Sequence, residues 1–296
     1  MIDTLSNFEK LFRVKQWVKN LFIFFPLLFA GKFYLLPKLS ACFIAFVGFC
    51  LVSSSVYILN DLIDIKADRL HPKKSKRPIA AGRIKKTTVL VLIGATMSAG
   101  LFTCYLADIL VLYLAAVYLA LHCAYNLATK KIIILDVISI AIGFQIRIWA
   151  GSVVAGVLPS IWLQLCVFLL SLFLGFTKRR YELSALRDKA AEHRNVLSHY
   201  TSYLLDQIII ISSTLTIVFY GLYTMSPDII DRIGNENMVY SLIFVIYGIF
   251  RYLYLVHVKK LGDDPGDVIF SDIPLMINIT LWIFFIIYVL YPVVVV

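Results

Sequence analysis

Only 16% of the residues in this 296-residue chain are charged, whereas 60% are hydrophobic. Soluble domains carry about 25% charged residues, so the composition excludes an ordinary soluble protein and predicts an all-α membrane protein with several spans. The formal net charge of +10 is concentrated between the apolar runs, which indicates membrane topology and anionic partners and argues against a nucleic-acid-binding fold.

The apolar runs predict nine membrane helices that form a single domain over residues 1–296. Their expected bounds are 18–36, 39–59, 87–106, 109–127, 135–155, 159–176, 203–225, 237–257 and 273–294. The first run is the weakest, because Pro26, Gly31 and Lys32 interrupt it. Basic residues gather before the first run and after the second, fourth, sixth and eighth runs. The positive-inside rule therefore places the N-terminus in the cytoplasm, the C-terminus outside, and every basic loop on the cytoplasmic face.

Just before the first run, polar residues recur at near-helical spacing around Trp17, which we interpret as an interfacial anchor. They are Arg13, Gln16, Lys19 and Asn20.

The stretch at residues 60–83 joins an acidic cluster to a basic one. Asn60, Asp61, Asp64 and Asp68 fall within an arc of roughly 100° if the helix that enters this stretch continues through Asp68. Carboxylates this close repel one another, and oxygen ligands favour a hard divalent cation such as Mg²⁺. Basic residues suited to phosphate follow at once: Arg69, Lys73, Lys74, Lys76, Arg77 and Arg83. A charged cytoplasmic loop is the alternative, but it does not explain acids on one helix face.

A second polar stretch, residues 124–151, contains Lys130, Asp136 and Arg147. Asp136 and Arg147 share a helix face at depths that differ by about 16 Å. An arginine inside a span needs a polar cavity or a partner, so Arg147 is either a phosphate ligand or the structural partner of a buried carboxylate.

The third basic cluster lies at residues 177–201, where we expect an amphipathic helix over the cytoplasmic mouth of the bundle. Lys178, Arg179 and Arg180 directly follow a span, and Arg187 and Arg194 share one face. The pattern fits a lid that grips an anionic substrate and equally fits a solvated helix with lysines and arginines at lipid headgroups.

The sequence NDLIDIKAD at residues 60–68 resembles the Asn-Asp-x-x-Asp-x-x-x-Asp signature of the UbiA superfamily of intramembrane prenyltransferases. Within that superfamily, the chain is most similar to the branch that transfers phosphoribosyl groups to polyprenyl phosphates. The similar stretches include RVKQWVKN at 13–20, HPKKSKRPIAAG at 71–82 and TKRRYELSALR at 177–187. Prenyltransferases of the superfamily usually carry a second Asp-x-x-x-Asp motif after the sixth helix, where this chain has basic residues instead.

The resemblance implies a UbiA-like bundle of nine transmembrane helices with a cytoplasmic active-site cavity. It also implies Mg²⁺-dependent transfer of 5-phosphoribosyl from 5-phosphoribosyl 1-diphosphate to a polyprenyl (decaprenyl-like) phosphate, with release of diphosphate. The chain would then work in the bilayer without nucleic acid, while a homo-oligomer stays open. Two competing hypotheses are a prenyltransferase that moves an isoprenyl group to an aromatic or quinone-precursor acceptor, and a transporter. A transporter would need a polar route to the outer face, and the outer loops carry few charges.

On this hypothesis three groups of side chains form the site. Mg²⁺ is held by Asn60, Asp61, Asp64 and Asp68. The catalytic residues are Asp61, Asp64 and Asp136, with Asp136 expected to stabilise the developing oxocarbenium ion or to orient the ribose. The substrate phosphates are bound by Lys19, Lys73, Arg77, Lys130, Arg147, Lys178, Arg179 and Arg194.

Overall fold

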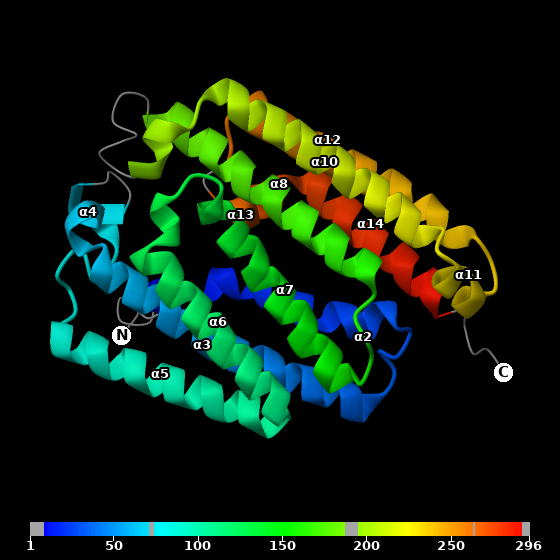
Figure 1. The fold of residues 1–296 in the computed structure, drawn as a ribbon, viewed down its shortest axis with the longest axis horizontal. Coiled ribbons are helices and arrows are strands. Elements are labelled where there is room, and N and C mark those ends of the chain that lie inside the picture. Colours follow the sequence, from blue (N-terminus) through cyan, green and yellow to red (C-terminus); the bar gives the residue numbers. More distant parts are fainter. Residues whose placement is uncertain (1–8, 71–73, 187–194, 263, 292–296) are drawn as a thin grey trace. The chain divides into compact units, whose positions relative to one another are not determined.

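The computed structural model describes residues 9–70, 74–186, 195–262 and 264–291, and these ranges contain helices and no strand (Figure 1). Eight of the helices in these ranges are long and apolar enough to cross a membrane. They are α3 (Leu36–Ile63), α5 (Lys86–Ala107), α6 (Ile109–Leu127), α7 (Leu135–Ala155), α8 (Ile161–Leu186), α10 (Ser202–Thr224), α12 (Leu242–His257) taken together with the 3₁₀-helix η6 that leads into it, and α14 (Ile273–Leu290). The all-α membrane fold is therefore confirmed, and eight of the nine predicted spans coincide with these helices.

Shorter helices make up most of the connections. They are η1 (Val14–Phe24), α2 (Phe25–Phe29), α4 (Ile65–Leu70), η2 (Lys74–Lys76), η3 (Thr129–Lys131), η5 (Asn195–His199), α11 (Pro227–Ile233), η6 (Asn237–Ser241) and α13 (Pro265–Ser271).

The first predicted span, residues 18–36, is not one continuous helix. The 3₁₀-helix η1 passes into the short helix α2, and a turn at Gly31 with φ +67° separates α2 from α3. Pro26 has no amide hydrogen to donate within a helix, and Gly31 adopts the left-handed conformation that other residues avoid. The same residues that weakened the sequence pattern therefore break the helix, and the total of nine spans stays a prediction.

The third basic cluster also differs from expectation. Residues 177–186 continue α8 for ten residues beyond the predicted end of the sixth span, rather than starting a separate amphipathic helix. Lys, Arg, Glu, Ala and Leu are all good helix formers, so the change from apolar to charged composition does not end the helix. Arg187 and Arg194 lie outside the described residues, so their assignment to a lid stays a prediction.

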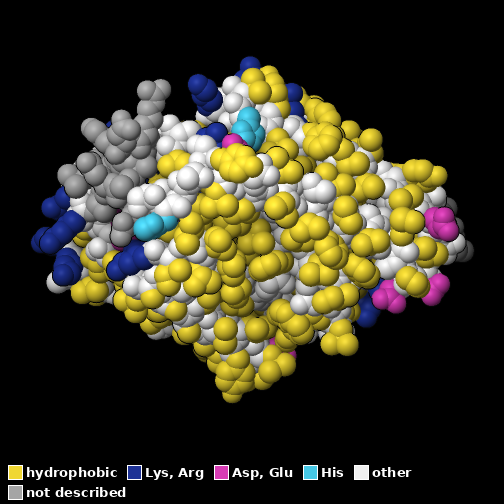
Figure 2. All heavy atoms as spheres, turned by 45° about the horizontal axis from the view of Figure 1, so that its top comes forward, with side chains coloured by type: hydrophobic (Ala, Val, Ile, Leu, Met, Phe, Trp, Pro, Cys, Tyr) yellow, Lys and Arg dark blue, Asp and Glu magenta, His cyan; other side chains and the backbone are white. Residues whose placement is uncertain are grey.

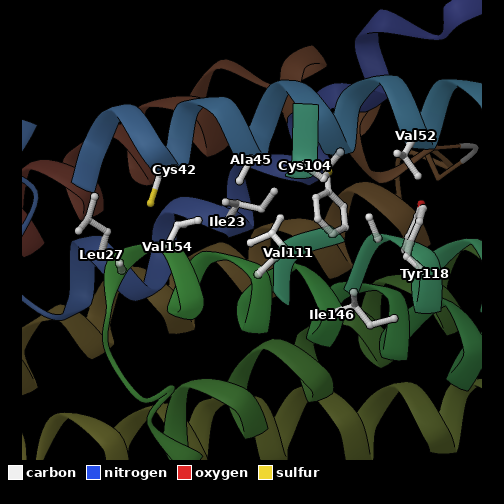
Figure 3. Close-up of a cluster of buried hydrophobic side chains, with 14 of the residues drawn as sticks. Ile23, Leu27, Cys42, Ala45, Val52, Cys104, Val111, Tyr118, Ile146 and Val154 are labelled. Atoms are coloured by element: carbon white, nitrogen blue, oxygen red, sulfur yellow. The ribbon is translucent and has the colours of Figure 1, made fainter. Parts of the chain in front are cut away.

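The chain divides into two compact units. The first contains the chain up to Leu27, Lys32–Ile132 and Ile146–Leu158, and the second contains Leu28–Gly31, Ile133–Gln145 and the chain from Pro159 onward. In the first unit α3 packs against α5 and α6, and Ile23, Ala45, Val111, Ile146 and Val154 contribute to its buried core (Figure 3).

In the first unit, η1 runs antiparallel to α3, because residue numbers rise along η1 as those of its partners fall along α3. Arg13 pairs with Asp61, Trp17 Nε1 donates to Ser54 Oγ at 3.0 Å, and Asn20 Nδ2 donates to Ser53 Oγ at 3.2 Å. η1 also meets α7, where the backbone of Ile23 lies directly against Gly151. The chain from Arg13 to Ile23 is thus fixed between two membrane helices.

The second unit has a separate core in which α8 packs against α10. Phe173 of α8 meets Tyr252 of α12 edge to face, with ring centroids 5.5 Å apart. Gly175 lies so close to Val137 that a Cβ atom there would come within 2.5 Å of the valine side chain.

Hydrophobic side chains dominate the molecular face shown in Figure 2. Large exposed apolar residues occur on α5, α12 and α14, among them Phe102, Phe250 and Phe284. Monomeric soluble proteins rarely expose continuous apolar areas of this kind, whereas lipid-facing helices require them. The chain is therefore a multi-pass membrane protein.

Candidate active site

The acidic cluster lies where α3 passes into α4. α3 ends at Ile63, Asp64 is its C-terminal cap, and α4 resumes at Ile65. The amide of Asp68 still donates to the carbonyl of Asp64 at 2.8 Å, so a helical hydrogen bond spans the interruption. The predicted continuation of the helix through Asp68 therefore holds apart from a local irregularity at Asp64.

Two of the carboxylates are buried and share one cation. Asp61, which is 3% exposed, pairs with both Arg13 and Arg77. Arg77 Nη1 lies 3.0 Å from Asp61 Oδ1 and 2.6 Å from Asp68 Oδ2. A single guanidinium nitrogen thus bridges two carboxylates from successive helices, and Arg77 belongs to the basic run that the sequence analysis assigned to phosphate.

The third carboxylate, Asp64, is more accessible, with its side chain 32% exposed. Lys130 of η3 reaches it, with Nζ 2.8 Å from Oδ1. This contact brings Lys130, which the sequence analysis assigned to substrate phosphate, into the acidic cluster. Asn60 is half-buried at the end of α3, one turn before Asp64.

The described residues contain no group of three or more His, Cys, Asp or Glu side chains arranged to hold a metal ion. The donor atoms at the junction of α3 and α4 are nevertheless oxygens from two neighbouring carboxylates, which are the ligands that Mg²⁺ prefers. Arg77 Nη1 marks a position from which a cation contacts both carboxylates. These residues therefore fit a hard divalent cation once Arg77 gives up that position.

Arg147 lies within the first unit and is 4% exposed. Its Nε donates to Asn20 Oδ1 at 2.7 Å and its Nη2 donates to Tyr118 OH at 3.0 Å. The guanidinium also stands 4.7 Å from the centre of the Tyr118 ring. These contacts, to an amide and a phenol, join η1, α6 and α7, and the assignment of Arg147 to a phosphate stays a prediction.

Asp136, in the second unit, has no exposed surface. It accepts hydrogen bonds from Arg179 Nε at 2.6 Å and from Tyr200 OH at 2.8 Å. Arg179 is 2% exposed and also donates to Glu182 at 2.7 Å. Burial and the negative charge of Asp136 raise the pKa of Tyr200 above its ordinary value, which keeps the phenol protonated as a donor. Direct contact between Asp136 and a substrate would therefore require this cluster to open.

The other basic residues at the end of α8 also face acids of the second unit. Arg180 Nε donates to Asp206 at 2.8 Å, and Lys178 Nζ lies 3.8 Å from Asp264. Lys19 is half-buried on η1 in the first unit. Two predicted phosphate ligands, Lys73 and Arg194, lie outside the described residues.

The sequence profile of the UbiA prenyltransferase family matches residues 21–266. The chain belongs to the UbiA prenyltransferase family. It is 31% identical over 290 residues to the decaprenyl-phosphate phosphoribosyltransferase of Mycolicibacterium smegmatis, covering 95% of this chain and 91% of that protein. It is 33% identical over 291 residues to the protein of the same name from Mycobacterium tuberculosis, covering 95% and 93% respectively.

The fold of this UbiA-family chain is similar to that of a solved UbiA homolog from Archaeoglobus fulgidus bound to GPP and Mg²⁺. The TM-score is 0.72 at 16% sequence identity, and the match covers 96% of this chain and 99% of that one. The UbiA-like fold predicted from the sequence is therefore confirmed.

Three side chains that pair with predicted site residues were absent from the prediction: Arg13 in the first unit, and Glu182 and Tyr200 in the second. Arg13 is one, although its spacing from Trp17 and Asn20 already indicated a common helix face. Glu182 and Tyr200 are the others, and each stands in a stretch where basic residues dominate. In addition, the buried Asn126 Oδ1 has no hydrogen-bond partner among the described residues. Glu182, Tyr200 and Asn126 are recognised only from their burial and their hydrogen bonding, which the sequence does not display.

Proposed function

We propose that this chain transfers 5-phosphoribosyl from 5-phosphoribosyl 1-diphosphate to a polyprenyl phosphate at the cytoplasmic face of the membrane, releasing diphosphate. The observation that carries the proposal is the cluster at the junction of α3 and α4, where Asp61, Asp64 and Asp68 alternate with Arg77 and Lys130. Carboxylates for a metal and cations for phosphates are what a metal-bound diphosphate requires. The two mycobacterial relatives, whose name specifies decaprenyl phosphate and phosphoribosyl transfer, support the choice of substrates.

Asn60, Asp61, Asp64 and Asp68 would hold Mg²⁺ in this proposal. The ion, when bound, neutralises the negative charge that builds up on the departing diphosphate. The Archaeoglobus fulgidus homolog solved with Mg²⁺ supports a metal in this fold.

The donor phosphates would bind Arg77 and Lys130, because both cations already lie against the acidic cluster. Lys19, Lys73, Lys178 and Arg194 stay candidates for the 5-phosphate or the lipid phosphate. We keep Arg147 and Arg179 in the same group, with the condition that each must first exchange its present partners.

The reaction replaces the diphosphate on the anomeric carbon with the lipid phosphate. The anomeric carbon becomes oxocarbenium-like as its bond to the diphosphate breaks, and Asp61 and Asp64 would favour this step as the carboxylates that hold the metal ion. Asp136 is the third predicted catalytic carboxylate and would act there only when its cluster with Arg179 and Tyr200 opens. The lipid phosphate is an anion at neutral pH, so its attack requires no general base. Inversion at the anomeric carbon is the simplest expected outcome.

We further propose that residues 1–296 form one membrane domain with the N-terminus in the cytoplasm and the C-terminus outside. The alternation of connections rich and poor in lysine and arginine supports this orientation. The orientation is tested by placing single cysteines in the 74–86 and 226–237 connections. Intact cells are then treated with a membrane-impermeant reagent that reacts with cysteine. Labelling of the first connection from outside would overturn the orientation.

A membrane assay tests the function itself. Purified protein is incubated with radiolabelled 5-phosphoribosyl 1-diphosphate, polyprenyl phosphate and Mg²⁺, and the lipid is then extracted. We expect label in the lipid phase that depends on both the acceptor and the metal. Absence of lipid label, together with transfer from an isoprenyl diphosphate to an aromatic acceptor, would replace the proposal with the prenyltransferase alternative.

A further inference from the structure

Arg77 occupies the position from which a metal ion would contact Asp61 and Asp68 together. Its Nη1 lies 3.0 Å and 2.6 Å from one oxygen of each carboxylate. Mg²⁺ binds carboxylate oxygens at about 2.0–2.1 Å, so an ion that bridges the same two side chains stands within a few ångströms of the guanidinium. Like charges this close repel strongly where the surroundings are buried, and Asp61 is only 3% exposed. The guanidinium and a divalent cation therefore compete for these carboxylates.

Among the described residues, the ion pairs of the cluster join three carboxylates to three cations without a metal ion. The negative charges of Asp61, Asp64 and Asp68 face the positive charges of Arg13, Arg77 and Lys130. A divalent cation that entered alone would leave an excess of positive charge. A diphosphate brings negative charge, and guanidinium and ammonium groups bind phosphate oxygens well. A diphosphate that takes Arg77 and Lys130 would therefore release the carboxylates for the metal.

Arg13 differs from Arg77 in its surroundings. It pairs with Asp61, and its guanidinium stands 4.9 Å from the centre of the Tyr57 ring. Arg77 contacts both buried carboxylates, comes from the connection after α4, and is 26% exposed. The side chains of Arg13 and Arg77 are exposed to similar extents, 21% and 26%, so the bridging position distinguishes Arg77 from Arg13.

We propose that Arg77 is a built-in competitor of the metal ion, so that metal and diphosphate bind this site together and each binds weakly alone. The inference rests on the proposed function, because it assumes that the metal ion and the diphosphate bind the same site. Arg77 then serves twice, as counter-ion of the empty carboxylates and as ligand of the donor diphosphate.

Two binding measurements on purified full-length protein test the proposal without recourse to activity. In the first, Mn²⁺ is titrated in the absence of any phosphate and free Mn²⁺ is followed by electron paramagnetic resonance. Arg77→Met should bind Mn²⁺ at least about tenfold more tightly than wild type, because the competitor is gone. In the second, radiolabelled pyrophosphate is bound at saturating Mg²⁺. Arg77→Met should bind it at least about tenfold more weakly, because a phosphate ligand is gone.

The opposite directions of these two changes separate competition from damage, since a distorted site would lose both ligands. Lys66→Met is the matched control, because it removes the same charge from an exposed position of α4 between Asp64 and Asp68. It should change neither affinity by more than about twofold. If Arg77→Met does not yield folded protein, Arg77→Gln removes the charge while retaining a hydrogen-bond donor, and the same two shifts are expected.

Mn²⁺ binding by the Arg77 variants that is no tighter than in wild type would overturn the proposal. An equal gain in Mn²⁺ affinity by the Lys66→Met control would also overturn it, because the gain would then follow from net charge alone. If the wild type does not transfer phosphoribosyl groups but the Arg77 variants show both changes in affinity, the proposed substrates are wrong and the competition between Arg77 and the metal ion is supported. Phosphoribosyl transfer by the wild type, together with unchanged Mn²⁺ affinity in the Arg77 variants, would support the proposed substrates and overturn the competition.

Discussion

The substitution Gly151→Ala should destabilise the first unit, because α7 leaves no room for a side chain there. A Cβ atom at this position would lie 1.9 Å from the backbone carbonyl oxygen of Ile23, whereas real Cβ atoms essentially never approach within 3.0 Å. The obstacle is backbone and not the end of a flexible side chain, so η1 or α7 must move by about 1 Å or more. Overpacking of this kind costs about 1–3 kcal/mol.

The control for this prediction is Gly94→Ala, in the interior of α5. A Cβ atom at Gly94 meets nothing within 4 Å, so the substitution should stabilise its helix by about 0.5–1 kcal/mol. Thermal unfolding in detergent measures both variants, and each kcal/mol should shift the melting temperature by about 2–4 °C. We expect the two variants to fall on opposite sides of wild type. A Gly151→Ala protein as stable as Gly94→Ala would refute the inference that η1 is seated on α7 through this glycine.

Three further predictions concern the charged residues. Asp64→Ala should lower phosphoribosyl transfer at least about a hundredfold while the melting temperature stays near that of wild type, because the side chain is partly exposed; an active variant would remove Asp64 from the metal site. Asp136→Asn should cost about 3 kcal/mol, the lower end for a broken buried ion pair because Glu182 still pairs with Arg179, and Tyr200→Phe, which removes one phenol hydroxyl, should cost only about 1 kcal/mol. Equal melting temperatures for these two variants would contradict the central place of the ion pair. Hydrogen bonds from Arg251 lower the pKa of Asp272, so this carboxylate stabilises the fold above its ordinary pKa of about 3.9 and the stabilisation is lost as pH falls through the lower folded value. Asp272→Asn should therefore lose less stability than wild type between about pH 4 and pH 2, which melting curves across that range would check.

The membrane helices were predictable because their signal is local. An apolar run of about 20 residues must form a helix in lipid, where every backbone amide needs an internal partner. Pro26 and Gly31 also marked the one predicted span that is broken, since both act on the backbone within a residue or two of their own positions. The end of α8 was missed for the converse reason. Residues 177–186 change from apolar to charged without any residue that stops a helix.

The acidic cluster was predictable for the same local reason, because Asp61, Asp64 and Asp68 are fixed relative to one another by helix geometry. The partner of each acid was not predictable, because the partner comes from a distant part of the chain. Lys130 is 66 residues from Asp64, and Arg179 is 43 residues from Asp136. A sequence indicates that a buried charge needs a partner, but tertiary packing decides which one it receives.

This difference affects how the eight predicted phosphate-binding cations should be ranked. A cation can neutralise a carboxylate of the protein or a phosphate of the substrate, and the sequence pattern is the same in both cases. Burial separates the two uses, because a guanidinium with almost no exposed surface must lose protein contacts before it gains a ligand. Arg147 and Arg179 meet that description. Arg77 and Lys130 stay partly exposed beside the acids that would hold the metal, so a diphosphate that arrives with its metal can take them from the carboxylates at no net loss of charge pairing.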